Sequence, residues 1–226
     1  MLLQRLAEYA ANQDDQMPKL YQEMPIRWLI DLTAEGQFQG FAMTVGDGKK
    51  TDRGKRYVAP SVSRTVDIKA NLLADNGEYV LGANRDPAGG ASEKVQRRHK
   101  AFRDVIVQCA EATKAPCLQA VQAFLVSLEQ AQCPLPEGFD AKDNLTIRVA
   151  GLLPFDLPDV RRFWGDSATT SVDAKKPAVN GAMRCIICSQ IRPIVAVHPV
   201  KIKGIPDGQT SGMTLISANA EAFESY

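Results

Sequence analysis

Two successive helical patterns in residues 92–132 constrain the fold more than any other feature of the sequence. The first follows Ser92, a residue type that caps helices, and the second begins at Pro116, a residue type favoured in the first helical turn. The short connection between them predicts an antiparallel αα-hairpin. The apolar stripes expected to be buried are Val95, Phe102, Ile106 and Cys109 in the first helix, and Leu118, Val121, Leu125 and Leu128 in the second.

Short alternating or apolar stretches on both sides of this hairpin predict strands. Residues 25–32 alternate like a half-buried strand, and residues 38–45 return after a turn, which predicts a β-hairpin with Trp28 in the core. We therefore expect an α+β fold with mixed, mostly antiparallel strands and the αα-hairpin packed beside them. Further strands are expected at 57–58, 64–69, 145–149, 183–187, 194–197, 200–202 and 213–216, and short helices at 2–10, 72–82 and 158–164.

The length of 226 residues, with 45% hydrophobic and 23% charged residues, is ordinary for a globular protein. The patterns suggest three subregions: 1–84 with mixed strands and a basic loop, 92–132 with the helical hairpin, and 143–226 with an α/β pattern and a glycine-rich loop. The net charge of +1 excludes a globally basic nucleic-acid binder, so any such role has to be local.

A glycine-bearing basic loop at residues 46–56 is the first local concentration of positive charge. Residues 47–69 hold seven Lys and Arg against three Asp. Five of these cations crowd into an exposed, mobile loop, as expected for a segment that contacts phosphates, although a solvated hairpin tip remains an alternative. The five are Lys49, Lys50, Arg53, Lys55 and Arg56.

The stretch from His198 to Tyr226 is the second candidate. Lys201 and Lys203 alternate along a predicted strand and would leave from one face. The loop 204–212 follows, with three glycines whose backbone N–H groups can approach a ligand. The neutral donors and acceptors of this loop are Gln209, Thr210 and Ser211. An ordinary strand-turn-strand with a Pro-Asp-Gly turn is the alternative.

A third group lies between these two. Arg64 and Lys69 flank the approach to Asn71 and Asn76, and Asp75 and Glu78 stand at capping-box spacing. Asparagine amides most often cap helices, but they also hydrogen-bond base edges, so both asparagines are candidates for DNA contact.

The cysteines and the N-terminus indicate a cytoplasmic protein without cofactors. Five cysteines in a chain of this length fit reduced thiols better than a disulfide framework. Cys185 and Cys188 have zinc-knuckle spacing, and a zinc ion would need His198 and the distant His99 to complete four ligands. A redox pair is a further alternative. The N-terminus has no secretory pattern, and no apolar run reaches membrane-spanning length.

No Walker-type loop or H-E-x-x-H pattern is present, so the motifs give no support to a hydrolase. The enzymatic alternative is a metal-dependent nuclease assembled from scattered acidic residues.

Five blocks of the sequence carry a resemblance to a known family. They are MLLQRLAEYA at 1–10, PIRWLIDL at 25–32, LLADNGEYVLG at 72–82, CIIC at 185–188, and HPVKIKGIPDGQTSGMTLISANAEAFESY at 198–226. The chain resembles the N-terminal part of the large subunit of the type I-C (Dvulg subtype) CRISPR Cascade surveillance complex. Members of that family continue past the position of Tyr226, so the resemblance implies an N-terminal domain, residues 1–226, without its C-terminal helical part.

The resemblance implies a non-catalytic role in DNA recognition. In such complexes the guide RNA reads the target by base pairing, whereas protein reads the short protospacer-adjacent motif on duplex DNA. The implied partners are target DNA, the subunit that holds the guide 5′ end, the backbone subunits with guide RNA, and the helicase-nuclease effector. The alternative is a scaffold that holds neighbouring subunits or guide RNA without reading the motif.

Overall fold

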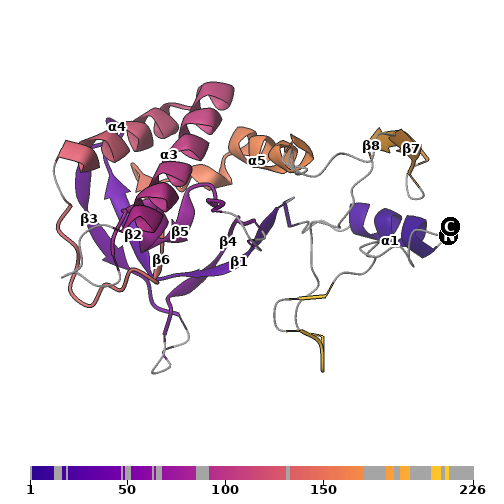
Figure 1. The fold of residues 1–226 in the computed structure, drawn as a ribbon, viewed down its shortest axis with the longest axis horizontal. Coiled ribbons are helices and arrows are strands. Elements are labelled where there is room, and N and C mark those ends of the chain that lie inside the picture. The colour runs from indigo at the N-terminus through magenta and orange to yellow at the C-terminus, as the bar shows by residue number, and fades with distance from the viewer. Residues whose placement is uncertain are drawn as a thin grey trace. The chain divides into compact units, whose positions relative to one another are not determined.

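A computed structural model describes residues 2–12, 17–18, 20–46, 48, 52–62, 64, 68–84, 92–130, 133–170, 182–185, 189–193, 205–209 and 212–213 (Figure 1). The chain contacts divide into two compact units. The larger is Met17–Asp166, and the smaller combines Met1–Gln16 with Ser167–Tyr226.

A four-stranded sheet in the order β3-β2-β6-β5 forms the centre of the larger unit. The expected hairpin is confirmed, because β2 (Trp28–Leu32) pairs antiparallel with β3 (Phe38–Met43). On its other side β2 pairs parallel with β6 (Asn144–Val149), which in turn pairs antiparallel with the short β5 (Ala74–Asn76). The predicted α+β class with mixed, mostly antiparallel strands is therefore confirmed.

A second, two-stranded sheet is formed by β1 (Tyr21–Ile26) and β4 (Lys55–Pro60), paired antiparallel. The prediction of one continuous strand over 25–32 is wrong, because the chain passes from one sheet to the other at Arg27. The Arg27 N–H donates to the Asn144 carbonyl (2.9 Å), and its carbonyl accepts from the Thr44 N–H (2.8 Å). Because of these hydrogen bonds, the chain after Ile26 belongs to the four-stranded sheet. The alternation of polar and apolar residues does not reveal such a change of partner strand.

The predicted αα-hairpin consists of α3 (Glu93–Thr113) and α4 (Pro116–Gln130), which lie side by side over the sheet (Figure 1). Ser92 caps α3 as expected, since its Oγ accepts from the Val95 N–H at 3.3 Å. Lys114 ends α3 in the left-handed region (φ 56°) and lets the chain reverse. The first stripe is buried as predicted, and in the second Leu128 is only partly buried.

The hairpin does not have a core of its own. It shares one apolar core with the sheet, in which Phe124 of α4 stacks on Phe38 of β3 at 6.0 Å between ring centroids. Trp28 is also buried there, as predicted, and its Nε1 donates to Asp143 Oδ2 at 3.1 Å. Each fully buried large apolar side chain contributes about 1.5–3 kcal/mol, so this common core stabilises sheet and helices together.

The helix-like segment predicted over 72–82 is only partly correct. Residues 74–76 form β5, and the helix that follows, α2 (Gly77–Val80), is a single turn. Asp75 does not cap it, because its carboxylate lies within the network described below, and the cap is Asn76.

After the 3-10 turn η1 (Pro154–Asp156) comes α5 (Pro158–Thr170), a helix longer than the predicted 158–164. Its residues up to Asp166 belong to the larger unit. In the smaller unit, α1 (Leu2–Ala11) matches the predicted N-terminal helix, and β7 (Ala182–Arg184) pairs antiparallel with β8 (Ile191–Pro193). The strands predicted at 194–197 and 200–202, and most of that at 213–216, lie outside the described residues. Among the helices in the described ranges, none combines the length and apolar character needed to cross a bilayer.

Candidate nucleic-acid interface

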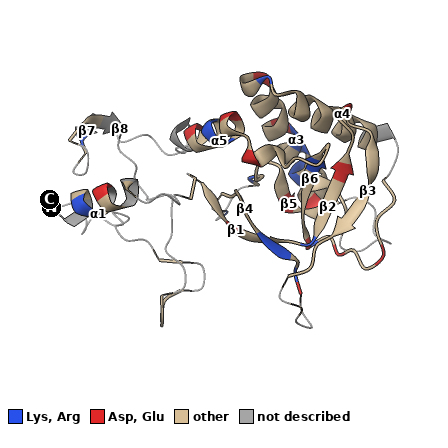
Figure 2. Ribbon diagram, turned by 180° about the vertical axis from the view of Figure 1, so that it is seen from behind, with Lys and Arg blue, Asp and Glu red and all other residues tan. Residues whose placement is uncertain are grey.

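Three basic residues stand close together in the chain where the β3–β4 loop enters β4, and two of them, Lys55 and Arg56, are successive strand residues with side chains on opposite faces. Arg53 and Lys55 are exposed, and the Arg56 side chain is 65% exposed beside Glu23, with a surface ion pair at 3.6 Å. Figure 2 shows ribbon in blue, the colour of Lys and Arg, near β4. Lys55 Nζ lies 5.5 Å from the centroid of the Tyr57 ring, a cation–π contact along the same face of the strand. We refer to Arg53, Lys55 and Arg56 as the β4 basic cluster.

The loop that carries this cluster is closed at its base by Asp52. Its Oδ2 accepts from the Gly46 N–H at 2.9 Å, and its Oδ1 accepts from the Gly54 N–H at 2.8 Å. These backbone hydrogen bonds hold the pKa of the Asp52 carboxyl below its ordinary value, with the Gly54 N–H as the largest cause. The carboxylate therefore joins the two ends of the loop, although the residue itself is solvent-accessible.

Two glycines permit this closure because a side chain has no room at either. A Cβ on Gly54, which has a φ of +92°, would lie 2.1 Å from the Ile26 carbonyl oxygen. A Cβ on Gly46 would lie 2.5 Å from the Gly54 carbonyl oxygen. Backbone that approaches this closely requires glycine, so the loop base is a fixed feature of the fold.

Two neighbouring side chains support the same base. The Arg27 guanidinium donates to the Asp52 carbonyl oxygen, and Thr44 Oγ1 accepts from the Lys55 N–H at 2.9 Å. The expected exposed loop is thus anchored on both sides, while Lys49 and Lys50 lie outside the described residues.

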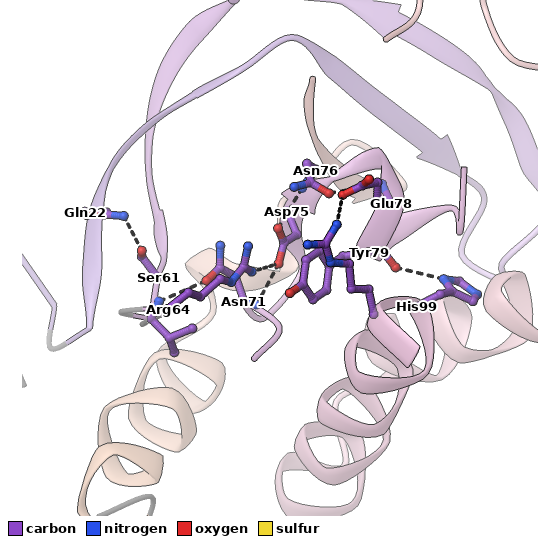
Figure 3. A network of polar contacts seen from close by, with 11 residues as sticks. Gln22, Ser61, Arg64, Asn71, Asp75, Asn76, Glu78, Tyr79 and His99 are labelled. Carbon is purple, nitrogen blue, oxygen red and sulfur yellow. Dashed lines mark hydrogen bonds and ion pairs between the residues drawn. The ribbon is translucent and has the colours of Figure 1, made fainter. Parts of the chain in front are cut away.

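A second set of polar residues surrounds Asp75, which is 2% exposed (Figure 3). Its carboxylate pairs with the Arg64 guanidinium and accepts from the N–H groups of Asn71 (2.9 Å) and Asn76 (2.8 Å). Burial raises the pKa of Asp75, and Arg64 opposes this increase. Arg64 also lies over the Tyr79 ring at 4.2 Å from its centroid, so this arginine is held by the fold.

The same tyrosine contacts residues of α3. The Arg98 guanidinium lies 5.6 Å from the Tyr79 ring centroid and forms an ion pair with Glu78, which is 4% exposed. His99 Nδ1 lies 2.9 Å from the Tyr79 carbonyl oxygen (Figure 3). The network around Tyr79 therefore ties the loop before β5 and the helix α2 to α3.

Residues 3–226 match the family described as CRISPR-associated protein (Cas_Csd1). The chain belongs to this family. The resemblance inferred from the five sequence blocks is confirmed, and a role as a CRISPR-associated component of a Cascade complex follows from the family. Among curated proteins, none matches the chain.

The two asparagines predicted to contact DNA in this family member have structural roles in the fold. Asn76 Oδ1 accepts from the Glu78 N–H at 3.1 Å, so the expectation of a cap is confirmed for Asn76. Asn71 is 5% exposed and caps no helix, and its Oδ1 accepts from the Val62 N–H at 3.0 Å. The contact of Asn71 and Asn76 with DNA stays a prediction.

The structure brings the predicted residues into two groups rather than one. Asp75 joins Arg64, Asn71 and Asn76, whereas the β4 basic cluster lies at the other end of β4. At about 3.3 Å per residue, Lys55 and the residue after Pro60 are roughly 20 Å apart. Lys69 is half-buried on the chain that leads to Asn71.

The glycine-rich loop belongs to the smaller unit. Residues 205–208 form a turn, with Asp207 at a φ of 60° and the Gly208 N–H bonded to the Ile205 carbonyl at 3.0 Å, as the Pro-Asp-Gly sequence predicts. Gln209 is exposed. Lys201, Lys203, Thr210 and Ser211 lie outside the described residues.

The zinc hypothesis is not tested by the structure. Cys185 directly follows β7, but Cys188 and His198 lie outside the described residues. Within the described ranges no group of three or more His, Cys, Asp or Glu side chains is arranged to hold a metal ion. Cys109 is fully buried, as predicted, and burial raises the pKa of its thiol to about 12.

Sequence reasoning missed Asp52 and Arg27, which organise the loop base. The Asp-x-Gly spacing of Asp52 and Gly54 is typical of a side chain that bonds backbone two residues further on, and it could have identified the aspartate. Nothing local marks Arg27, whose guanidinium reaches a residue 25 positions away.

Proposed function

We propose that this chain is a non-catalytic DNA-recognition component of a type I-C Cascade complex that contacts the duplex carrying the protospacer-adjacent motif. The observation that carries the proposal is the β4 basic cluster, three exposed cations at the end of an anchored loop and the start of β4. Lys49 and Lys50 belong to the same loop in the sequence and add to its charge.

Cations of this kind recognise the phosphate backbone rather than the bases. Each phosphate contact releases counterions, so binding weakens with salt and is nearly independent of sequence. The cluster would position the duplex, and discrimination between motifs would fall to neutral groups. Gln209, Thr210 and Ser211, predicted from the sequence, are the groups we assign to this task, with guide pairing following once the strands part.

The proposal includes partners and the absence of catalysis. The chain would act in the cytoplasm beside the subunit that holds the guide 5′ end and the backbone subunits with guide RNA, and would precede the helicase-nuclease effector. It would need no cofactor of its own. Cleavage of target DNA by the complex without the effector, abolished by EDTA, would contradict the non-catalytic assignment.

The test measures binding of the assembled complex to a library of duplexes that differ in the motif. The variant with Arg53, Lys55 and Arg56 replaced by Ala should bind every duplex more weakly while keeping the order of preference. The matched control removes Lys94 and Arg97, two exposed cations on α3. Loss of copurification with the other subunits, together with unchanged duplex affinity in complexes that still form, would instead support a scaffold.

A further inference from the structure

Asp52 is an acidic residue in a segment dominated by positive charge. It stands directly before Arg53 and three residues before Lys55. If charge alone determined its effect, a carboxylate at this position would repel a phosphate backbone and weaken binding.

The contacts of the carboxylate explain its presence differently. Both oxygens accept backbone N–H groups at the loop base, from Gly46 at 3.2 and 2.9 Å and from Gly54 at 2.8 Å. The residue's own carbonyl accepts from Arg27. Asp52 therefore bonds to both ends of the loop and to Arg27, the residue just before β2.

The residues that follow Asp52 are fixed by these contacts. Gly54 is bound by the carboxylate, and the Lys55 N–H is bound by Thr44 Oγ1 at 2.9 Å. The backbone is thus held on both sides of Arg53 and again at Lys55. Holding a binding group in place before the ligand arrives reduces the entropy lost on association.

We infer that Asp52 is a positioning residue for duplex binding, which closes the loop base so that Arg53 and Lys55 are presented in a fixed arrangement to the phosphate backbone. This inference rests on the proposed function. It assigns to an acidic residue a favourable effect on the binding of a polyanion, which is the opposite of the effect of its charge.

The charge of Asp52 and its positioning role predict opposite changes in duplex affinity, so a substitution of Asp52 tests the inference directly. In the assembled complex, Asp52→Ala removes a negative charge and the closure together, and we expect affinity for a labelled duplex to fall on the order of fivefold. Asp47→Ala removes the other acidic residue of the same loop and should leave the affinity unchanged or raise it. A rise in affinity for Asp52→Ala would overturn the inference.

A second comparison uses two glycines that differ in their surroundings. Gly54 and Gly48 both have positive φ (+92° and +65°), but a Cβ on Gly48 meets nothing within 4 Å, whereas one on Gly54 meets the Ile26 carbonyl. Gly54→Ala should lower duplex affinity, and Gly48→Ala should not. Equal losses for the two variants would mean that closure of the base is irrelevant.

A double-mutant cycle separates positioning from a general loss of structure. In the background Arg53→Ala, Lys55→Ala, the further change Asp52→Ala should leave duplex affinity unchanged or raise it, because the groups that it positions are absent and only its charge is lost. The same fivefold loss in that background would overturn the inference.

The cycle also distinguishes this inference from the proposed function. Unchanged affinity in the Arg53→Ala, Lys55→Ala variant would overturn both. A loss of affinity there, without a loss in Asp52→Ala, would overturn the positioning role alone.

Discussion

The two ends of β4 use the same residue types for different purposes. At the far end, Arg64 is 28% exposed, but it is paired with the buried carboxylate of Asp75 and lies over Tyr79, so its charge is satisfied by residues of the fold. At the near end, Arg53, Lys55 and Arg56 remain exposed. The carboxylate beside them, Asp52, accepts backbone N–H groups from both ends of the loop.

The difference teaches that a count of basic residues does not locate an interface. The group around Asp75 and the β4 basic cluster differ in how deeply the nearest carboxylate is buried and in which groups donate hydrogen bonds to it. A buried carboxylate needs a cation and several N–H groups to offset its desolvation, and the cation that it holds contributes to folding. An exposed carboxylate that accepts only backbone N–H groups organises the chain and leaves neighbouring side chains at the surface.

The largest expected effect lies at the buried end. Asp75→Ala leaves the N–H groups of Asn71 and Asn76 without their acceptor and removes the partner of Arg64, so the free energy of unfolding should fall by about 3 kcal/mol. Urea denaturation of the chain measures it. Lys55→Ala, the matched change at the exposed end, should alter stability by less than about 0.5 kcal/mol. Equal losses of stability in the two variants would contradict the difference proposed between the two ends of β4.

Asn71 should show a smaller effect of the same kind. Its Oδ1 is the acceptor for the Val62 N–H in a buried setting, so Asn71→Ala should destabilise the chain by about 2 kcal/mol. Binding of the variant complex to correct-motif and wrong-motif duplexes then decides whether Asn71 also contacts DNA. A smaller difference in affinity between correct-motif and wrong-motif duplexes, with the stability of the chain unchanged, would show that Asn71 contacts DNA and does not stabilise the fold.

The pH dependence of stability should differ between the two carboxylates. Burial raises the pKa of Asp75 above its ordinary value of 3.8, so the protonated form favours the folded state. The stability that this group contributes is full below pH 3.8 and decreases as the pH rises through the raised value. The difference in stability between the wild type and Asp75→Asn should therefore shift against the wild type as the pH rises through the raised value, whereas a shift in favour of the wild type would show that ion pairing with Arg64 outweighs burial.

The smallest effect is expected at the surface pair of Arg56 and Glu23. Both side chains are well exposed, and such pairs contribute little, so Glu23→Gln should change stability by less than about 0.5 kcal/mol. Removing the acid should nevertheless raise duplex affinity slightly, because one negative charge beside the β4 basic cluster is lost. A measurable drop in affinity would show that Glu23 positions Arg56 in the way proposed for Asp52.

Local patterns predicted the parts of the fold that depend on local interactions. The Ser92 cap follows from its residue type, and the buried stripe follows from the helical period; the structure confirms both. The stripe consists of Val95, Phe102, Ile106 and Cys109. The change of sheet at Arg27 could not be predicted, because it depends on pairing with residues far along the chain.

The candidate site shows the same limit. The sequence identified the basic loop and its cations, because charge and glycine content are visible in a short window. It did not show that Arg64 is held by a buried carboxylate, since the burial of Asp75 results from the packing of β5 and α2 beneath α3. The role of Asp52 depends on the glycines that it joins, which are separated by eight positions in the chain but bound to one side chain.

The salt dependence of duplex binding tests the central claim most directly. The account predicts that replacing Arg53, Lys55 and Arg56 with Ala in the assembled complex flattens the slope of log affinity against log salt by about one unit per lost phosphate contact. The Arg64→Ala complex, in which an arginine held by Asp75 is removed, should keep the wild-type slope. An unchanged slope for the first variant, or an equal change for the second, would contradict the claim that the exposed end of β4 is the part that meets DNA.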